Sequence, residues 1–333
     1  MSQVWKKLIS REGVDITTIS GLDVVFYACV RELNKTIQEP FFTYLKDKIL
    51  SHYLCVDSVE VGRKIYPHFF KTPAQVRRHY REGVKFLATV RKSVKLWGRQ
   101  ASNKDYNWQS QAFSVFRKQF MYVNFQFSIW PWWGIESWQI DAEQVIQQMI
   151  RRGHLDKRQE QILASIYKPW KTTAIVHLQN RLSKGESVKR LVKEYQFLRS
   201  WSVVWFRSID KKWLLDFKQK SEIGAKFKFL SRAELVRLLR PSRKEKWFLD
   251  IAPYIIFFKD WRDDVRRTHV YLWSFLFDSI AQRFGVERSD IRYLSLDELE
   301  NSLKTGKLPS THIYRRKKQS CIITRGSSDL AMK

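Results

Sequence analysis

Apolar residues recur at helical spacing along most of this chain. After Thr72-Pro73, a capping hydroxyl followed by proline at a first helical position, apolar residues return at spacings of three, four or seven positions. They are Val76, Tyr80, Val84, Leu87, Val94 and Trp97. A second stripe contains Phe113, Phe116, Phe120, Val123 and Phe127. The two patterns predict two long amphipathic helices.

Start and stop signals predict further helices. Ser231 and Ser295 each begin a capping box, in which a hydroxyl residue is followed three positions later by glutamate. Pro241 closes the first of these helices and Gly306 the second. A long helix from about Asp260 to Phe284 should stop at Gly285, and two or three helices should lie between Lys171 and Lys220.

The predicted fold class is therefore mainly α, an irregular multi-helix bundle with room for a small α+β portion at the N-terminus. Only the segments Leu22–Val30 and Ile313–Thr324 have strand character. We divide the chain into an N-terminal part at 1–150, a helical domain at 151–310 and a basic tail at 311–333.

Composition supports a folded protein. The chain has 14 Trp and 22 Phe but only 12 Gly and 8 Pro, which favours helices over turn-rich sheets. Cys29, Cys55 and Cys321 are far apart, so neither a zinc site nor a disulfide framework is expected. No signal peptide and no apolar run of about 18 residues is present, so we expect a cytoplasmic protein without a transmembrane segment.

The most apolar segment, Phe125–Ile135, is short, contains Pro131 and is interpreted as core or interface. An alternative is that Trp130, Trp132 and Trp133 attach the protein to the surface of a membrane.

The net charge of +28, with a pI near 10.1, favours polyanionic partners. Six cations follow one face of the first long helix: Arg77, Arg81, Lys85, Lys92, Lys95 and Arg99. Such a face could bind the phosphates of nucleic acid, or it could simply be solvated. Its aromatic neighbours Tyr80 and Trp97 fall on the apolar stripe and are expected in the core.

No catalytic signature is present. The chain lacks a G-x-x-x-x-G-K-[ST] phosphate loop and the G-x-G-x-x-G, H-E-x-x-H and G-x-S-x-G patterns. No two of the seven histidines have metal-ligand spacing, and His269 and His312 are expected to be structural. We therefore name no catalytic residue and no metal site.

A cluster of charged residues occupies one stretch of the long C-terminal helix. Asp260, Asp263, Asp264 and Arg267 are three to four residues apart, a spacing that favours intrahelical ion pairs on a solvated face. The alternative is that Arg262 and Arg266 project together and bind a phosphate or carboxylate. We expect alanine at both positions to weaken phosphate binding without unfolding the protein.

Four segments resemble one family. They are Tyr195–Leu198 (YQFL), Asp260-Trp261-Arg262, Asp290–Leu299 (DIRYLSLDEL) and Ile313–Arg316 (IYRR). Together they resemble the central helical region of phosphoenolpyruvate synthase-like and rifampin phosphotransferase-like proteins, over about residues 160–320. In that family an ATP-grasp domain phosphorylates a histidine on a swivelling domain, which carries the phosphoryl group to a second site.

Neither catalytic part of that family is recognisable in this sequence. The resemblance implies a helical substrate-binding or docking module of a phosphotransfer system, at most a non-catalytic part of the phosphotransferase. It implies separately encoded ATP-grasp or phosphohistidine domains as partners and a phosphate-bearing ligand. ATP, Mg²⁺ and phosphoenolpyruvate would be cofactors only with those domains, and none is assigned to this chain. The alternative function is a basic all-α nucleic-acid-binding protein.

Overall fold

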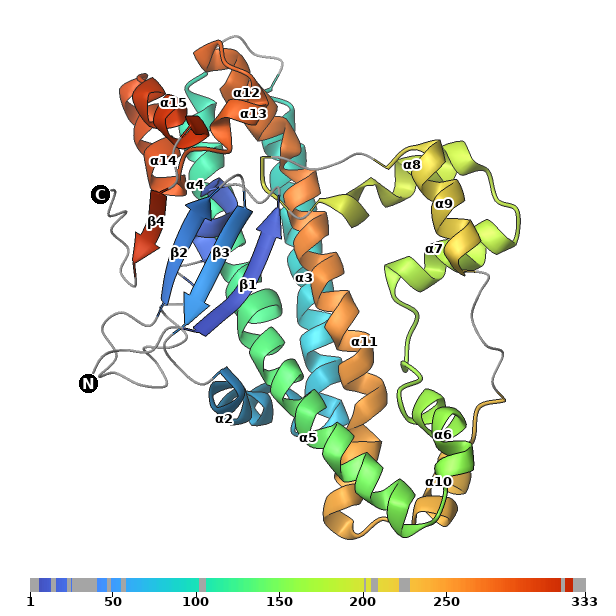
Figure 1. The fold of residues 1–333 in the computed structure, drawn as a ribbon. Coiled ribbons are helices and arrows are strands. Elements are labelled where there is room, and N and C mark those ends of the chain that lie inside the picture. Colours follow the sequence, from blue (N-terminus) through green and yellow to red (C-terminus); the bar gives the residue numbers. More distant parts are fainter. Residues whose placement is uncertain are drawn as a thin grey trace, which may run out of the picture.

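The protein is mainly α-helical, as the sequence predicts, with one small sheet (Figure 1). The computed structural model describes residues 6–12, 16–22, 25, 41–46, 49–54, 58–101, 106–200, 202–204, 209–221, 228–318 and 321–325. A short helical segment at residues 16–22 follows the first strand.

Long helices of the first half surround the core. They are α2 (Ser58–Phe70), α3 (Pro73–Gly98), α4 (Trp108–Val123) and α5 (Trp130–Arg152), with a π-helical turn at Asn124–Ile129 between α4 and α5. Both predicted stripes largely face inward. All five predicted aromatic and valine positions from Phe113 to Phe127 are fully buried, whereas Val84 of α3 is 46% exposed and was wrongly assigned to the core.

The second half adds shorter helices around one long one. They are α6 (Gln159–Ile166), α7 (Ala174–Ser183), α8 (Val188–Tyr195), α9 (Lys211–Ser221), α10 (Arg232–Leu239), α11 (Arg243–Leu272), α12 (Ser274–Phe284), α13 (Arg288–Ile291), α14 (Leu296–Thr305) and α15 (Ser310–Lys318). Short 3-10 turns lie at Asp156–Arg158 and Gln196–Arg199.

Figure 1 shows α3 and α11 side by side through the middle of the molecule, with α12–α15 at one end and α6 and α10 at the other. The main hydrophobic cluster joins these helices and includes residues from both sides of position 150. Helices α7–α9 form a smaller cluster of their own around Leu178, Leu191 and Leu214.

Capping residues explain most helix ends. Capping boxes begin at Ser231 and Ser295, as predicted, and Thr72, predicted only as a capping hydroxyl, also begins one. Gly285 and Gly306 end their helices in the left-handed conformation. The long C-terminal helix differs from the prediction. It begins after another capping box at Ser242 and is interrupted at Trp273.

The sheet contains strands from both ends of the chain. Its order is β1-β3-β2-β4, and each neighbouring pair is antiparallel. The strands are β1 (Lys6–Glu12), β2 (Phe41–Lys46), β3 (Ile49–Leu54) and β4 (Cys321–Arg325).

The predicted strand at Leu22–Val30 is wrong over its described residues, and the one at Ile313–Thr324 is only partly right. Leu22 and Val25 are helical, and the other residues up to 30 lie outside the described part of the chain. In the C-terminal segment the strand covers Cys321–Arg325, while Ser310–Lys318 is helix α15.

The tryptophan-rich segment belongs to the core rather than to a membrane-facing surface. Trp130 is 6% exposed and Trp133 is 1% exposed. Helix α2 packs closely on α5 here, since a Cβ on Gly62 would lie 2.3 Å from the Trp133 carbonyl oxygen. Two of the three tryptophans that could have attached the protein to a membrane surface are therefore buried. Across the described residues, none of the helices has both the length and the apolar character that crossing a bilayer requires.

Candidate functional site

The predicted polyanion face lies on the outside of α3. All six of its side chains are exposed: Arg77, Arg81, Lys85, Lys92, Lys95 and Arg99. At 100° and 1.5 Å per residue, they fall within an arc of about 80° and extend over roughly 33 Å. Arg91, which the sequence analysis did not include, is also exposed and lies beside this arc. Glu82 is the one acidic residue within α3.

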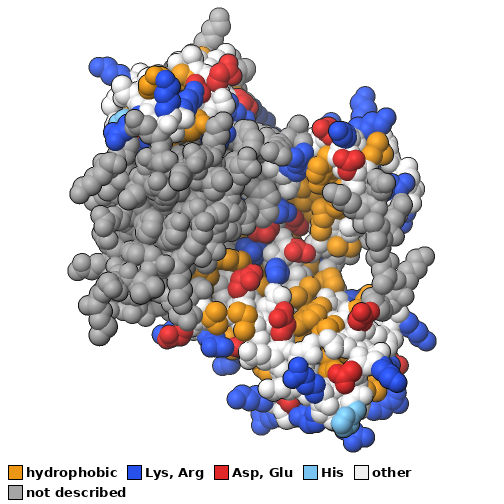
Figure 2. Space-filling view, viewed as in Figure 1, with side chains coloured by type: hydrophobic (Ala, Val, Ile, Leu, Met, Phe, Trp, Pro, Cys, Tyr) orange, Lys and Arg blue, Asp and Glu red, His pale blue; other side chains and the backbone are white. Residues whose placement is uncertain are grey.

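Four of these cations have neither an ion pair nor a side-chain hydrogen bond among the described residues. In the part of the chain that the structure describes, Arg81, Lys85, Lys92 and Lys95 form no ion pair. Arg77 is different, because its Nη1 donates a hydrogen bond to the Tyr254 hydroxyl at 3.0 Å. The face viewed in Figure 2, on which α3 lies largely behind α11, instead mixes basic and acidic side chains. The outer face of α3 thus concentrates positive charge.

Arg262 and Arg266 are not on a solvated face. Each is 7% exposed, because this side of α11 packs against other helices. The Arg262 Nη1 donates to the Ser128 carbonyl at 3.2 Å and lies 3.1 Å from an Asp263 oxygen. Their role in anion binding stays a prediction. The expectation that alanine here leaves the fold intact now conflicts with their burial.

Asp264, on the same helix, reaches a different element. Its carboxylate accepts a hydrogen bond at 3.1 Å from the backbone N–H of Ala174, the first residue of α7. This carboxylate therefore serves as the hydrogen-bond acceptor at the N-terminus of α7, where Thr173 makes no side-chain cap. Burial raises the pKa of Asp264 to about 7, although this hydrogen bond and Arg267 oppose the rise.

His269 lies fully buried among aromatic rings. Its imidazole stacks on Phe116, with ring centroids 5.5 Å apart, and also contacts Phe86 and Phe120. Neither ring nitrogen has a hydrogen-bond partner among the described residues. Burial, assisted by the positive charge of Arg266, lowers its pKa to about 3. The imidazole is therefore neutral, and its surroundings are those of a structural residue.

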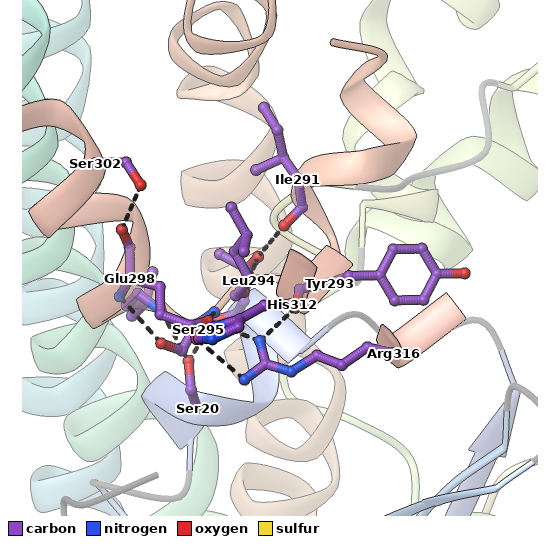
Figure 3. A network of polar contacts seen from close by, with 11 residues as sticks. Ser20, Ile291, Tyr293, Leu294, Ser295, Glu298, Ser302, His312 and Arg316 are labelled. Atoms are coloured by element: carbon purple, nitrogen blue, oxygen red, sulfur yellow. Dashed lines mark hydrogen bonds and ion pairs between the residues drawn. The ribbon is translucent and has the colours of Figure 1, made fainter. Parts of the chain in front are cut away.

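The segment with the strongest family resemblance forms a tightly bonded junction (Figure 3). Glu298, in the capping box of α14, binds Arg316 and His312 of α15. Arg316 also donates to the Tyr293 carbonyl at 2.6 Å.

The short N-terminal helical segment closes the other side of this junction. The Thr17 hydroxyl donates to the Ile291 and Leu294 carbonyls at 3.0 and 2.7 Å, and Ser20 accepts a hydrogen bond from the Leu296 N–H. The sequence indicates the capping box but not that Thr17, Ser20 and Arg316 bond to this segment. No local signal could have revealed partners that are 18 to 277 residues away.

Among the described residues, no three His, Cys, Asp or Glu side chains lie close enough together to hold a metal ion. In comparisons with known proteins, the chain matches no family model, no curated protein and no solved structure.

Proposed function

We propose that this chain is a helical docking module of a phosphoenolpyruvate synthase-like phosphotransfer system, without catalytic activity of its own. The observation that carries the proposal is the junction around Glu298. Residues 290–299, which resemble the stretch before the swivelling domain in that family, are held between the N-terminal segment and α15 by buried and partly buried hydrogen bonds. A domain that swings between two sites needs a base that does not move with it, and this junction has the bonding of such a base.

In this proposal the partners are separately encoded ATP-grasp and phosphohistidine domains in the cytoplasm. ATP, Mg²⁺ and phosphoenolpyruvate would bind to those domains or between them and this chain. Arg262 and Arg266 are the side chains proposed to contact a phosphate or carboxylate, since guanidinium groups bind such anions bidentately.

The test is complex formation with purified ATP-grasp and phosphohistidine domains of a phosphoenolpyruvate synthase-like enzyme. We expect a stable complex with at least one domain in size-exclusion chromatography with light scattering. Isothermal titration with phosphoenolpyruvate should then show weaker binding for Arg262→Lys with Arg266→Lys, which keeps the charges but removes the planar donors. No complex with either domain would overturn the docking proposal.

A second candidate function is binding of nucleic acid, which the exposed cations of α3 favour. If the face binds a single strand, the logarithm of the affinity should fall with the logarithm of salt concentration by about 0.7 per phosphate neutralised. Lys92→Gln with Lys95→Gln should reduce that slope by roughly 1.4. The matched control, Lys211→Gln with Lys212→Gln on α9, removes the same charge from other exposed positions and should leave the slope unchanged.

A further inference from the structure

A cleft of about 450 Å³ opens between α3 and α4, beside the cationic face. Phe86 and Tyr122 line it with aromatic rings, whose centroids are 5.3 Å apart. Lys85 contributes from α3 and Lys118 from α4, and both side chains are exposed. The volume is within the range of about 300–1,000 Å³ that is typical of small-ligand sites.

The aromatic lining is available to a ligand. Tyr122 is 45% exposed although its ring also packs near Phe127, at 6.1 Å between centroids. An exposed ring of this kind, fixed from below by other rings, is a surface on which a planar aromatic group can stack. Phe86 is only 9% exposed and supports Tyr122 rather than offering a free face.

Polar groups in the cleft are held in place before any ligand binds. The Gln119 amide donates to the Ser93 hydroxyl at 3.0 Å and accepts from the Trp273 indole N–H at 2.9 Å. Glu82 is oriented by His79, whose Nδ1 lies 3.0 Å from a carboxylate oxygen. A carboxylate and an amide held by such bonds can hydrogen-bond the polar edge of a heterocycle at a lower cost in ordering.

Lys85 and Lys118 are placed to bind the phosphate part of such a ligand. Neither forms an ion pair within the described part of the chain. Two unpaired ammonium groups beside an exposed aromatic ring match a planar heterocycle linked to phosphate. Because Lys85 also belongs to the cationic face of α3, a strand whose phosphates follow that face would pass the opening of the cleft.

We propose that this cleft binds a nucleotide unit, with the base stacked on Tyr122 and its phosphate between Lys85 and Lys118. For a nucleotide within a single strand, the proposal rests on the nucleic-acid-binding candidate and deepens it by adding a base-stacking site. The same chemistry could be supplied by a free mononucleotide, and the experiment separates the two sources.

The experiment compares two fluorescein-labelled strands by anisotropy at low and near-physiological salt. One is a 12-nucleotide oligothymidylate, and the other is an abasic strand of the same length with the same phosphates. We expect the wild-type protein to bind the strand with bases about tenfold more tightly, since stacking of one base is worth about this factor. Tyr122→Ala should abolish the preference without changing the affinity for the abasic strand, and Tyr122→Phe should retain it.

Three results overturn the proposal in different ways. Equal affinity of the wild-type protein for both strands would leave only the cationic face as a binding surface. An unchanged preference in Tyr122→Ala would place base recognition elsewhere. Binding of neither strand, together with no heat of binding for thymidine monophosphate in isothermal titration, would overturn both the cleft and the nucleic-acid candidate. Heat with the mononucleotide but no strand binding identifies the free nucleotide as the ligand and supports the cleft.

Discussion

The guanidinium of Arg316 donates one hydrogen bond to each carboxylate oxygen of Glu298, with N···O distances of 2.7 and 3.1 Å. The Arg316 side chain is 1% exposed and that of Glu298 is 15% exposed. Burial alone would raise the pKa of Glu298, but the bonds from Arg316, the Ser295 N–H and His312 outweigh it and leave that pKa lowered. The pair therefore joins α14 to α15 as a charged contact with little access to water.

Arg316→Ala should destabilise the protein by about 3 kcal/mol, because it leaves the Glu298 carboxylate without its main buried partner. Urea unfolding followed by far-UV circular dichroism measures the change. The control is Lys304→Ala, which removes an exposed pair with Glu300. That substitution should cost no more than about 0.5 kcal/mol. Equal effects of the two substitutions would contradict the structural role of the junction.

Two glycines of α3 should respond to alanine with opposite signs. A Cβ on Gly83 would lie 2.3 Å from Cη2 of Trp261, within the contact between α3 and α11. Gly83→Ala should therefore cost about 1–3 kcal/mol. A Cβ on Gly98 meets nothing within 4 Å, so Gly98→Ala should stabilise the helix by up to about 1 kcal/mol.

The thermal midpoints of both glycine variants, measured side by side, test this packing. A stabilising Gly83→Ala would mean that α3 and α11 are farther apart than the structure places them.

Asp264 should make the protein less stable as the pH rises. Its folded-state pKa is raised to about 7, whereas an unfolded aspartate titrates near 3.8. Between these values the native state binds more protons than the unfolded state, so the free energy of unfolding falls with rising pH, by no more than roughly 4 kcal/mol. Asp264→Asn cannot titrate and should lack this loss.

The measurement is the difference in unfolding free energy between wild type and Asp264→Asn at intervals from pH 4 to 7.5. The difference should move in favour of the asparagine variant as the pH increases. Parallel profiles would show that Asp264 is already ionised at pH 4.

The effect of His269 on the free energy of unfolding should have the opposite dependence on pH. Its folded-state pKa is lowered to about 3 from the ordinary value of 6.5, so the unfolded state takes up a proton first as the pH falls. Stability should therefore decrease below pH 6.5. His269→Phe removes two ring nitrogens that have no hydrogen-bond partner among the described residues, and it should be more acid-resistant than wild type in thermal unfolding at pH 4. Loss of stability in this variant at pH 7 as well as pH 4 would indicate that the imidazole makes a contact that phenylalanine cannot replace.

The helices that were predicted best are those with local signals at both ends. Ser295, its glutamate three residues later and Gly306 act within a few residues of one another, so α14 could be placed from the sequence. The outward position of the α3 cations was predictable for a similar reason. Helical periodicity places Arg81 and Lys95 on one side of the helix and the buried Val76 and Val90 on another. The start of α5 has no such local signal, because Trp130 continues a π-helical turn without a capping residue.

The sequence by itself thus determined the helical class of the protein and the charged surface of α3, because both follow from interactions within three or four residues. Only the tertiary structure decided that Arg262 and Arg266 are buried, that Asp264 caps α7, and that strands from both chain ends share a sheet. Those outcomes depend on which surfaces meet across tens to hundreds of residues. Helical periodicity does not encode that pairing, because a charged face has the same spacing whether water or another helix covers it.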